Sequence, residues 1–183
     1  MKLLAYAVLL VTGGMGMTAL YPAIRGPWES YAHVSLALLL IFLSVLIHEL
    51  GHAAAVRFVK GDLQAIAVVP FELRLRPRRL SLVRRLRGRE VGGYVTYAIN
   101  RVGARRKHMI VALAGPGASL ALAVLAAIGA EALATQSPVG AFCAGLALVS
   151  GGAGIANLLP FEGSDGAQIL QRWRAGRLRE KPE

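Results

Sequence analysis

One apolar stretch constrains this chain more than any other part of its sequence. Residues 31–56 are long and hydrophobic enough for a membrane-spanning helix, yet they contain His48, Glu49 and His52 within one short run. An ionisable side chain near the middle of such a helix costs about 2.5–3.5 kcal/mol on membrane-insertion scales. Ionisable side chains inside a span are therefore expected to serve a function.

These three residues form an HExxH motif, with His48 and His52 four positions apart. On a helix the two imidazoles lie about 40° apart around the axis, so both can bind one ion. Glu49 lies about 100° round from His48, where its carboxylate can reach a water molecule at that ion. The pattern is typical of helical metalloproteases, with two imidazole ligands and a carboxylate as general base. The alternative, a chance match, fits poorly with a place inside a span.

The composition indicates an integral membrane protein. The 183 residues are 55% hydrophobic and 17% charged, whereas soluble domains carry about 25% charged residues. Four apolar stretches are long enough to span a membrane: 3–20, 31–56, 109–134 and 139–159. The first could be read as a signal peptide, but its apolar run continues to Tyr21 without a clear cleavage site. We predict an all-α integral membrane protein of about four transmembrane helices, with residues 1–183 forming a single membrane-embedded domain.

The distribution of positive charge predicts the topology. Arg25 is the one Lys or Arg between the first and second stretches. All the others lie before the first stretch, within 57–108, or from Arg172 onward. By the positive-inside rule, both termini, the loop 57–108 and the tail 167–183 are cytoplasmic, in a multi-pass protein of the cell (plasma) membrane. Topology thus accounts for the formal net charge of +11, and we expect no nucleic-acid partner.

The basic loop 57–108 is expected to hold a short β-strand or hairpin element. Residues 65–75 read as a strand interrupted or edged by Pro70, and residues 92–99 as a second short strand. Between them, the strongly basic residues 76–89 carry Leu80, Val83 and Leu86 at helical spacing. They predict either a cationic amphipathic turn on the anionic inner leaflet of the bilayer or a simply solvated basic loop.

A catalytic zinc usually has three protein ligands, so one more residue is needed. Asp165 is the leading candidate, because it follows a helix break predicted at Pro160 and Gly163, at the same depth as the motif. Glu162 is its main rival. Other residues lie in a strand, at the wrong depth, or among cations suited to headgroups: Glu72, His33, Glu131 and His108. The single cysteine, Cys143, reads as a packed side chain, so no thiolate site is expected.

Several motifs follow one another along the chain: HELGH at 48–52, Gly92-Gly93 before a short strand, Ala114-Gly115-Pro116, Asn157-Leu-Leu-Pro160 and Ser164-Asp165-Gly166. Together they span roughly residues 41–170 and resemble the site-2 protease family of intramembrane zinc metalloproteases. This resemblance implies one Zn²⁺ per chain, held by His48, His52 and Asp165. It implies that Glu49 is the general base and that a zinc-bound water is the nucleophile.

The resemblance also suggests where a substrate would bind. Asn157 and Pro160 are expected to shape the substrate site, and Gly92 and Gly93 begin an edge strand to which an extended substrate could add. Ser164 departs from the family pattern, since a hydrophobic residue commonly precedes Asp-Gly, and Ser119 stands where many members have Asn. No room exists for a PDZ or nucleotide-sensing module, so we expect a compact member of the bacterial type.

The predicted function is hydrolysis of a peptide bond in or near a transmembrane segment of a membrane-protein substrate. One alternative is a non-catalytic membrane protein of the same fold that binds zinc or a partner. Another is a zinc-handling transporter, which would need several more acidic or His sites within the membrane than the sequence contains.

Overall fold

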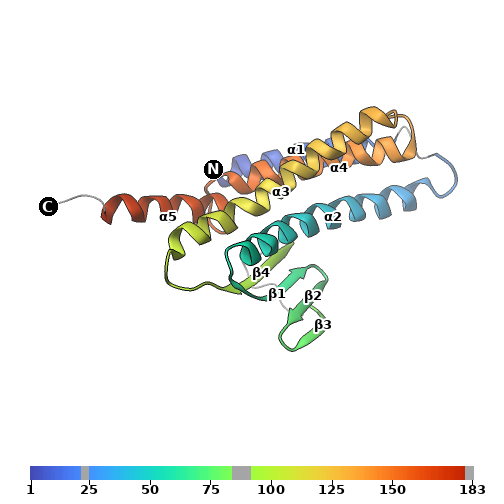
Figure 1. The fold of residues 1–183 in the computed structure, drawn as a ribbon. Helices are drawn as coiled ribbons and strands as arrows, with labels where there is room; N and C mark the ends of the chain where they lie inside the picture. Colours follow the sequence, from blue (N-terminus) through green and yellow to red (C-terminus); the bar gives the residue numbers. More distant parts are fainter. Residues whose placement is uncertain (22–24, 84–91, 180–183) are drawn as a thin grey trace.

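The structure is a computed structural model that describes residues 1–21, 25–83 and 92–179. The chain is mostly helical and carries a small antiparallel sheet (Figure 1). Helices α1 to α4 lie along one another as an elongated bundle, and the sheet lies beside the C-terminal half of α2 (Figure 1). The elements are α1 (Lys2–Thr18), α2 (Glu29–Phe58), β1 (Asp62–Val68), β2 (Phe71–Leu75), β3 (Arg78–Leu82), β4 (Gly93–Ala98), α3 (Ala104–Ala132), α4 (Pro138–Leu158) and α5 (Asp165–Arg179).

Among the described residues, three helices are long and apolar enough to cross a membrane: α2, α3 and α4. They correspond to the predicted stretches 31–56, 109–134 and 139–159, with small shifts at their ends. The predicted stretch 3–20 forms α1, whose 17 residues are fewer than the roughly 20 of a typical crossing. Length and composition thus support three of the four predicted spans, and the first stays a prediction.

The segment 65–75, predicted as a strand interrupted or edged by Pro70, is interrupted there and forms two strands. β1 and β2 are antiparallel neighbours joined by a turn at Val69 and Pro70, with Val68 opposite Phe71. Pro70 has no N–H to donate to a ladder, so the chain turns there instead of continuing. The other predicted strand, 92–99, is present as β4 and pairs with β1. The sheet has the order β3-β2-β1-β4 and is therefore larger than the predicted hairpin.

The basic segment 76–89 is not helical where the structure describes it. Residues Arg78–Leu82 form β3 and pair with β2, although Leu80 and Val83 had suggested helical spacing. The apolar–polar alternation of residues 80–82 matches that of β2, and pairing with a neighbouring strand decides the outcome. Leu86 falls in 84–91, outside the described residues.

The sheet packs on α2 through a shared apolar core. Its buried members come from the end of α2, the start of β1 and the start of α3: Ala53, Ala55, Val56, Val59, Leu63 and Val111. Further along, the rings of Phe42 on α2 and Phe71 on β2 lie edge to face, with centroids 6.4 Å apart. The sheet therefore runs back along α2, from the end of that helix to a level well inside it.

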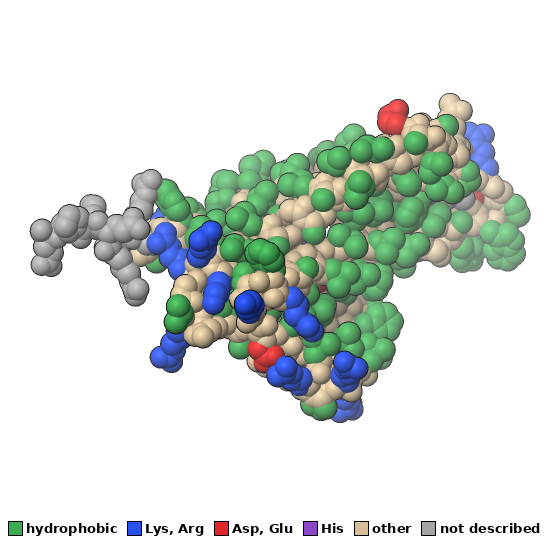
Figure 2. All heavy atoms as spheres, in the orientation of Figure 1, with side chains coloured by type: hydrophobic (Ala, Val, Ile, Leu, Met, Phe, Trp, Pro, Cys, Tyr) green, Lys and Arg blue, Asp and Glu red, His purple; other side chains and the backbone are tan. Residues whose placement is uncertain are grey.

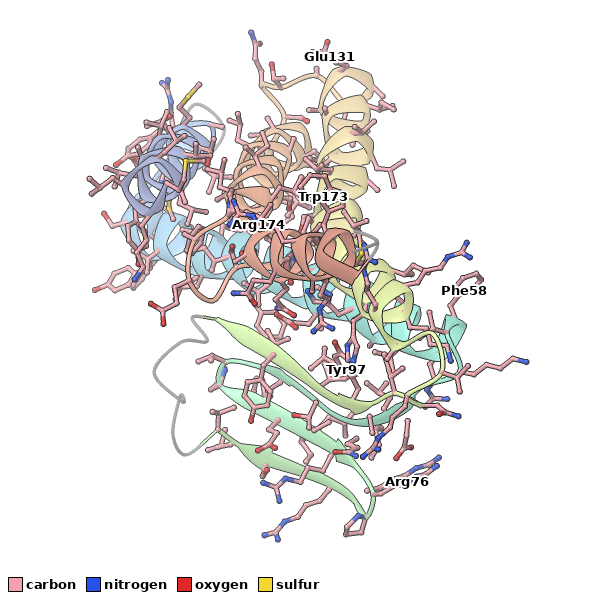
Figure 3. All side chains as sticks on the ribbon, turned by 90° about the vertical axis from the view of Figure 1, so that its left-hand side faces the viewer. Phe58, Arg76, Tyr97, Glu131, Trp173 and Arg174 are labelled. Carbon is pink, nitrogen blue, oxygen red and sulfur yellow. The ribbon has the colours of Figure 1, made fainter. Side chains whose placement is uncertain are left out.

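Positive charge gathers mainly at one end of the molecule. Lys and Arg side chains cover the sheet and the neighbouring ends of α3 and α5, whereas apolar side chains cover the bundle (Figure 2). Phe58, at the end of α2, points away from the helices, and Glu131 lies at the end of α3 remote from the sheet (Figure 3). The long axis of the bundle thus separates a basic end from a mostly apolar body.

Between α4 and α5 the helix breaks where the sequence predicted. α4 ends at Leu158 and α5 begins at Asp165, so Pro160 and Gly163 lie in the connection. Gly163 has a φ of 91°, a conformation that favours glycine. The residues after the break form α5, which packs against the start of α3, where the Arg105 guanidinium donates to the Trp173 carbonyl at 3.4 Å.

Candidate metal centre and active site

Helix α2 carries two imidazoles on one buried face. Leu40, Ser44, His48 and His52 follow one another at four-residue intervals, and all four are buried. The rings of His48 and His52 lie nearly perpendicular, with centroids 4.8 Å apart. The two side chains are thus one helical turn apart on the same side of α2.

Helix α3 orients both rings. The Nδ1 atom of His48 lies 3.0 Å from Ser119 Oγ, and the Nδ1 atom of His52 lies 2.7 Å from the Val111 carbonyl oxygen. Because a carbonyl oxygen can only accept, His52 Nδ1 carries the proton and Nε2 is left with its lone pair. The two Nε2 atoms face each other at 3.2 Å.

Asp165 reaches this pair from the N-terminus of α5. Its Oδ2 atom lies 3.2 Å from His48 Nε2 and 3.4 Å from His52 Nε2. The buried Ser164 hydroxyl caps the helix, since its Oγ accepts from the Ala167 N–H at 3.1 Å and the Phe161 N–H at 3.2 Å. A carboxylate in the first turn of a helix is further stabilised by the helix dipole.

The three donor atoms fit one metal ion. Two nitrogens and one oxygen form a nearly equilateral triangle with sides of 3.2, 3.2 and 3.4 Å. Tetrahedral zinc, with bonds of about 2.0–2.2 Å, needs its ligand atoms about 3.3–3.6 Å apart. His48, His52 and Asp165 therefore form a group that could hold a metal ion.

Gly115 on α3 makes room for these side chains. A Cβ atom at this position would collide with the His52 ring and would lie 2.8 Å from His48 Nε2. A Cβ atom on Gly51 of α2 would come 2.6 Å from the Ala118 Cβ atom. Small residues on both helices thus let α2 and α3 cross closely at the level of the cluster.

Glu49 lies beside the cluster, where α2 meets the edge strand β4. It is only 6% exposed. A Cβ atom on Gly93 would lie 2.7 Å from Glu49 Cγ and 2.8 Å from the Ala67 carbonyl oxygen. Glycine at position 93 therefore allows the strand to approach this carboxylate closely.

The family model of peptidase family M50 matches residues 36–138, more than half of the chain. This chain belongs to peptidase family M50. The resemblance to the site-2 proteases is thereby confirmed, and the members of this family are zinc metalloproteases. The matched region contains the HExxH motif and Gly92-Gly93, while Asp165 lies beyond it. No curated protein and no solved structure matches the chain.

Of the residues predicted to act in this M50 chain, the structure brings together His48, His52 and Asp165, with Glu49 and Gly93 beside them. Gly92 directly precedes β4 and has a φ of 107°. Two other residues, Asn157 and Pro160, were predicted to shape the substrate site, and this stays a prediction. Asn157 is half-buried near the end of α4 and Pro160 is exposed after it, and neither has a described hydrogen bond to the cluster.

The rival ligand candidate Glu162 and the candidates set aside from the sequence have other surroundings. Glu162 is exposed in the loop before α5, and the Glu72 carboxylate accepts from Arg74 Nε at 3.0 Å. The His33 ring stacks on Tyr21, with centroids 4.5 Å apart. His108, predicted to suit headgroups, instead shares a hydrogen bond of 3.1 Å with the Tyr97 hydroxyl. Tyr97 lies between the sheet and the helices (Figure 3). Within the described residues, His48, His52 and Asp165 are the one group of three suited to a metal.

Four residues that support the cluster were not assigned this role from the sequence. Ser119 and Val111 orient the imidazoles, Gly115 leaves space for them, and Ser164 caps the helix that carries Asp165. The sequence held a signal for Ser164, because Ser before Asp-Gly after a helix break is typical of an N-cap. It held none for Val111, since any residue supplies a carbonyl oxygen.

Proposed function

We propose that this chain is a zinc-dependent intramembrane endopeptidase. The observation that carries the proposal is the triangle of donor atoms from His48, His52 and Asp165, with the Glu49 carboxylate beside it, on a helix able to cross a membrane. Membership of family M50 supports a protease of this class.

In this proposal His48, His52 and Asp165 hold one Zn²⁺ ion, and the Nδ1 bonds to Ser119 and Val111 keep both imidazoles in place. A bound zinc ion supplies a Lewis acid that polarises the scissile carbonyl and lowers the pKa of a water molecule. Burial of all three ligands excludes bulk water and strengthens every electrostatic interaction among them.

Glu49 is the general base in this mechanism. Its carboxylate accepts a proton from the water that attacks the carbonyl carbon, and it then gives that proton to the leaving amine nitrogen as the C–N bond breaks. Since Glu49 lies one position after His48 on α2, its backbone is fixed by the same helix that carries two ligands. General bases of this kind contribute about 10²–10⁴-fold to rate.

We propose further that the substrate is a transmembrane segment of a membrane protein, bound in extended form beside β4. This strand is at one end of the sheet, and Gly93 allows it to lie against Glu49. Addition of a substrate strand at such an edge would satisfy backbone groups that a helix must release before cleavage. Asn157, Pro160 and Gly92 are the remaining proposed substrate contacts.

The finer topology belongs to the same proposal. We propose that α1 is a fourth span, that residues 1–183 form one membrane-embedded domain, and that both termini face the cytoplasm of a cell membrane. The gathering of Lys and Arg over the sheet and the ends of α3 and α5 supports this orientation (Figure 2).

The test compares the wild type with Glu49→Gln in membranes of an expressing cell. We expect membrane-protein fragments, detected by quantitative peptide mass spectrometry, to fall by at least about 100-fold in the variant. Zinc content of the purified chains, measured by atomic emission, should stay at one per chain in both. Equal zinc without any Glu49-dependent fragment would favour a non-catalytic zinc-binding protein instead. Cleavage that persists in the variant would exclude Glu49 as the base.

A further inference from the structure

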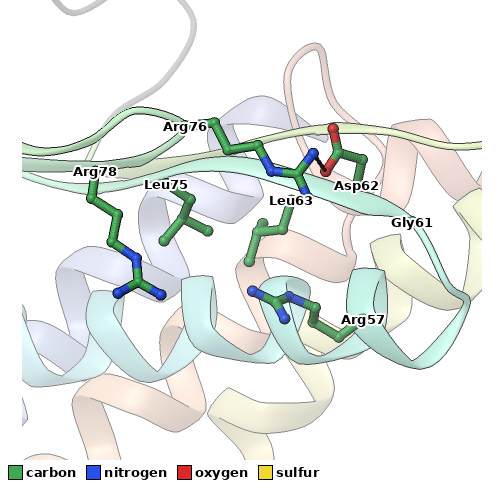
Figure 4. Close-up of a pocket in the computed structure, with 7 residues that line it drawn as sticks. All are labelled: Arg57, Gly61, Asp62, Leu63, Leu75, Arg76 and Arg78. Atoms are coloured by element: carbon green, nitrogen blue, oxygen red, sulfur yellow. Dashed lines mark ion pairs between the residues drawn. The ribbon is translucent and has the colours of Figure 1, made fainter.

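A second site lies at the other end of the sheet, away from the metal cluster. It is a pocket of about 250 Å³ between the C-terminal end of α2 and the β2–β3 turn. Its main lining residues are Arg57, Asp62, Leu63, Leu75, Arg76 and Arg78 (Figure 4). Along β1, Asp62 at the pocket and Val68, which is opposite Gly93, are six positions apart, or about 20 Å. The pocket also shares no residue with the group His48, His52 and Asp165.

The pocket is strongly cationic. Three guanidinium groups line it together with one carboxylate, and Arg76 Nη1 pairs with Asp62 Oδ1 at 3.3 Å. Arg57 and Arg78 have no ion pair with a carboxylate among the described residues. Both point into the space between α2 and the sheet, from opposite walls (Figure 4). Two uncompensated guanidiniums converging on one small space suit a phosphate, which arginine can bind through two parallel hydrogen bonds.

Arg78 occupies a place where an apolar residue is expected. The apolar face of the β2–β3 hairpin carries Phe71, Leu73 and Leu75 on β2, and the residues paired with them are Leu82, Leu80 and Arg78. Arg78 is thus the one charged residue on this face within 71–75 and 78–82, and it lies at the end that borders the pocket. Arg57 is in the last turn of α2, where the helix dipole favours a positive charge. No such reason accounts for a charged residue at position 78.

The rest of this face indicates that the phosphate belongs to a lipid. Leu80 is 67% and Leu82 64% exposed, which in water would be a liability on an edge strand. The face leads from the pocket to Phe71, about 13 Å along β2, and Phe71 contacts Phe42 inside a helix able to cross a membrane. Acyl chains lying against Leu80 and Leu82 would therefore run from the surface level of α2 into the bilayer.

We propose that this pocket binds the phosphate of an anionic glycerophospholipid from the leaflet at the C-terminal end of α2. Arg57 and Arg78 hold the phosphodiester, and the exposed leucines contact the acyl chains. A headgroup with an ammonium group is disfavoured, because three arginines outnumber the single aspartate. The pocket is smaller than the roughly 300–1,000 Å³ of sites for drug-sized ligands, and a glycerol-phosphate headgroup is correspondingly small.

The test is native mass spectrometry of the delipidated full chain in detergent, titrated separately with phosphatidylglycerol, phosphatidylcholine and inorganic phosphate. We expect one phosphatidylglycerol to bind at least about tenfold more tightly than phosphatidylcholine. Arg57→Gln and Arg78→Gln should each remove most of this preference. Arg79→Gln is the matched control, since it removes the same charge from the next position of β3, whose side chain points to the opposite face.

A further variant, Leu80→Ser, distinguishes a lipid from free phosphate. It should weaken binding of phosphatidylglycerol and leave any binding of inorganic phosphate unchanged. Inorganic phosphate that binds as tightly as phosphatidylglycerol would overturn the lipid assignment. No preference for phosphatidylglycerol, or equal losses in Arg78→Gln and Arg79→Gln, would overturn the site itself. Zinc content shows that each variant has folded, and the binding result does not depend on peptidase activity.

Discussion

The metal cluster is assembled from two regions that hold their ligands by different means. His48 and His52 lie on one long regular helix, where the four-residue spacing alone puts both side chains on one face. Asp165 stands at the very start of α5, after a broken connection, and depends on the Ser164 cap and on the packing of α5 against α3. One half of the site is set by local helix geometry, and the other half is set by tertiary structure.

Gly166 shows how tightly the second half is constrained. A Cβ atom there would collide with the carbonyl oxygen of Leu158, at the end of α4. The chain therefore passes from α4 to α5 with backbone close to backbone, and Asp165 is held next to that contact. The comparison leads to a general expectation: changes in the residues that support α5 should act through the position of Asp165, while changes in the residues of α3 that contact the imidazoles should act on them directly.

The largest effect is expected from Asp165→Ala, which removes a whole ligand from the α5 half. Zinc affinity should fall by more than about 100-fold, the upper range for loss of a mere outer-shell partner. The measurement is competition with a fluorescent chelator, using purified protein in detergent. Glu162→Ala, in the same connection, is the control and should keep wild-type affinity. An unchanged affinity in Asp165→Ala, with a loss in Glu162→Ala, would move the third ligand to Glu162.

Gly115→Ala tests the helix-pair half by adding one methyl group. The new Cβ atom would collide with the His52 ring, so we expect a sharp drop in zinc content, measured by atomic emission. Gly117→Ala is a matched control on the same helix, because no atom lies within 4 Å of a Cβ at that position. If both variants bind zinc equally well, the close crossing of α2 and α3 is not needed for the site.

A matched pair of serine substitutions then compares the two halves directly. Ser119→Ala removes the partner of His48 Nδ1 and should cost about 10–100-fold in zinc affinity, as other outer-shell losses do. The decisive measurement is zinc affinity at constant pH by chelator competition. No loss in this variant would show that helix geometry alone orients His48.

Ser164→Ala should have the smallest effect of the series. Loss of an N-cap typically costs about 1 kcal/mol. At most this energy reaches the metal site through the position of Asp165, so zinc affinity should fall by about fivefold or less. Thermal unfolding monitored by circular dichroism should show the loss of stability. A greater loss of zinc affinity in Ser164→Ala than in Ser119→Ala would contradict the prediction that the cap of α5 matters less than the partner of His48.

Sequence reasoning anticipated the parts of this protein that depend on local periodicity. It placed the three helices able to cross a membrane, the turn-to-turn alignment of His48 and His52, and the break after α4. It left open whether Pro70 interrupts or edges the strand at 65–75, because proline is compatible with both an edge strand and a turn, and only the pairing of β1 with β2 decides between them. For 76–89 it offered an amphipathic turn or a solvated loop, because Leu80, Val83 and Leu86 have helical spacing, and the pairing of β3 with β2 could not be read from the sequence.

The place of Asp165 near the two imidazoles could be argued from its depth and by elimination. The residues that orient the imidazoles and leave room for them could not be predicted from the sequence. Val111 acts through a backbone carbonyl, and Gly115 acts through what it lacks, so neither leaves a chemical signature in the sequence. Such contacts appear only when two helices are placed side by side. The pocket at Arg57 and Arg78 is of the same kind, because 21 positions separate residues that face one space.

The hydrogen bonds at the Nδ1 atoms of His48 and His52 also fix the position of α3 along α2. His48 bonds to Ser119 and His52 to Val111, so the helices are pinned at two points that lie about 12 Å apart along α3. A slip of one turn, about 5.4 Å, would break both bonds at once, and it would leave His48 without a hydroxyl partner, since positions 115 and 123 are Gly and Ala. We therefore expect α2 and α3 to move as a single piece in any conformational change of this protein.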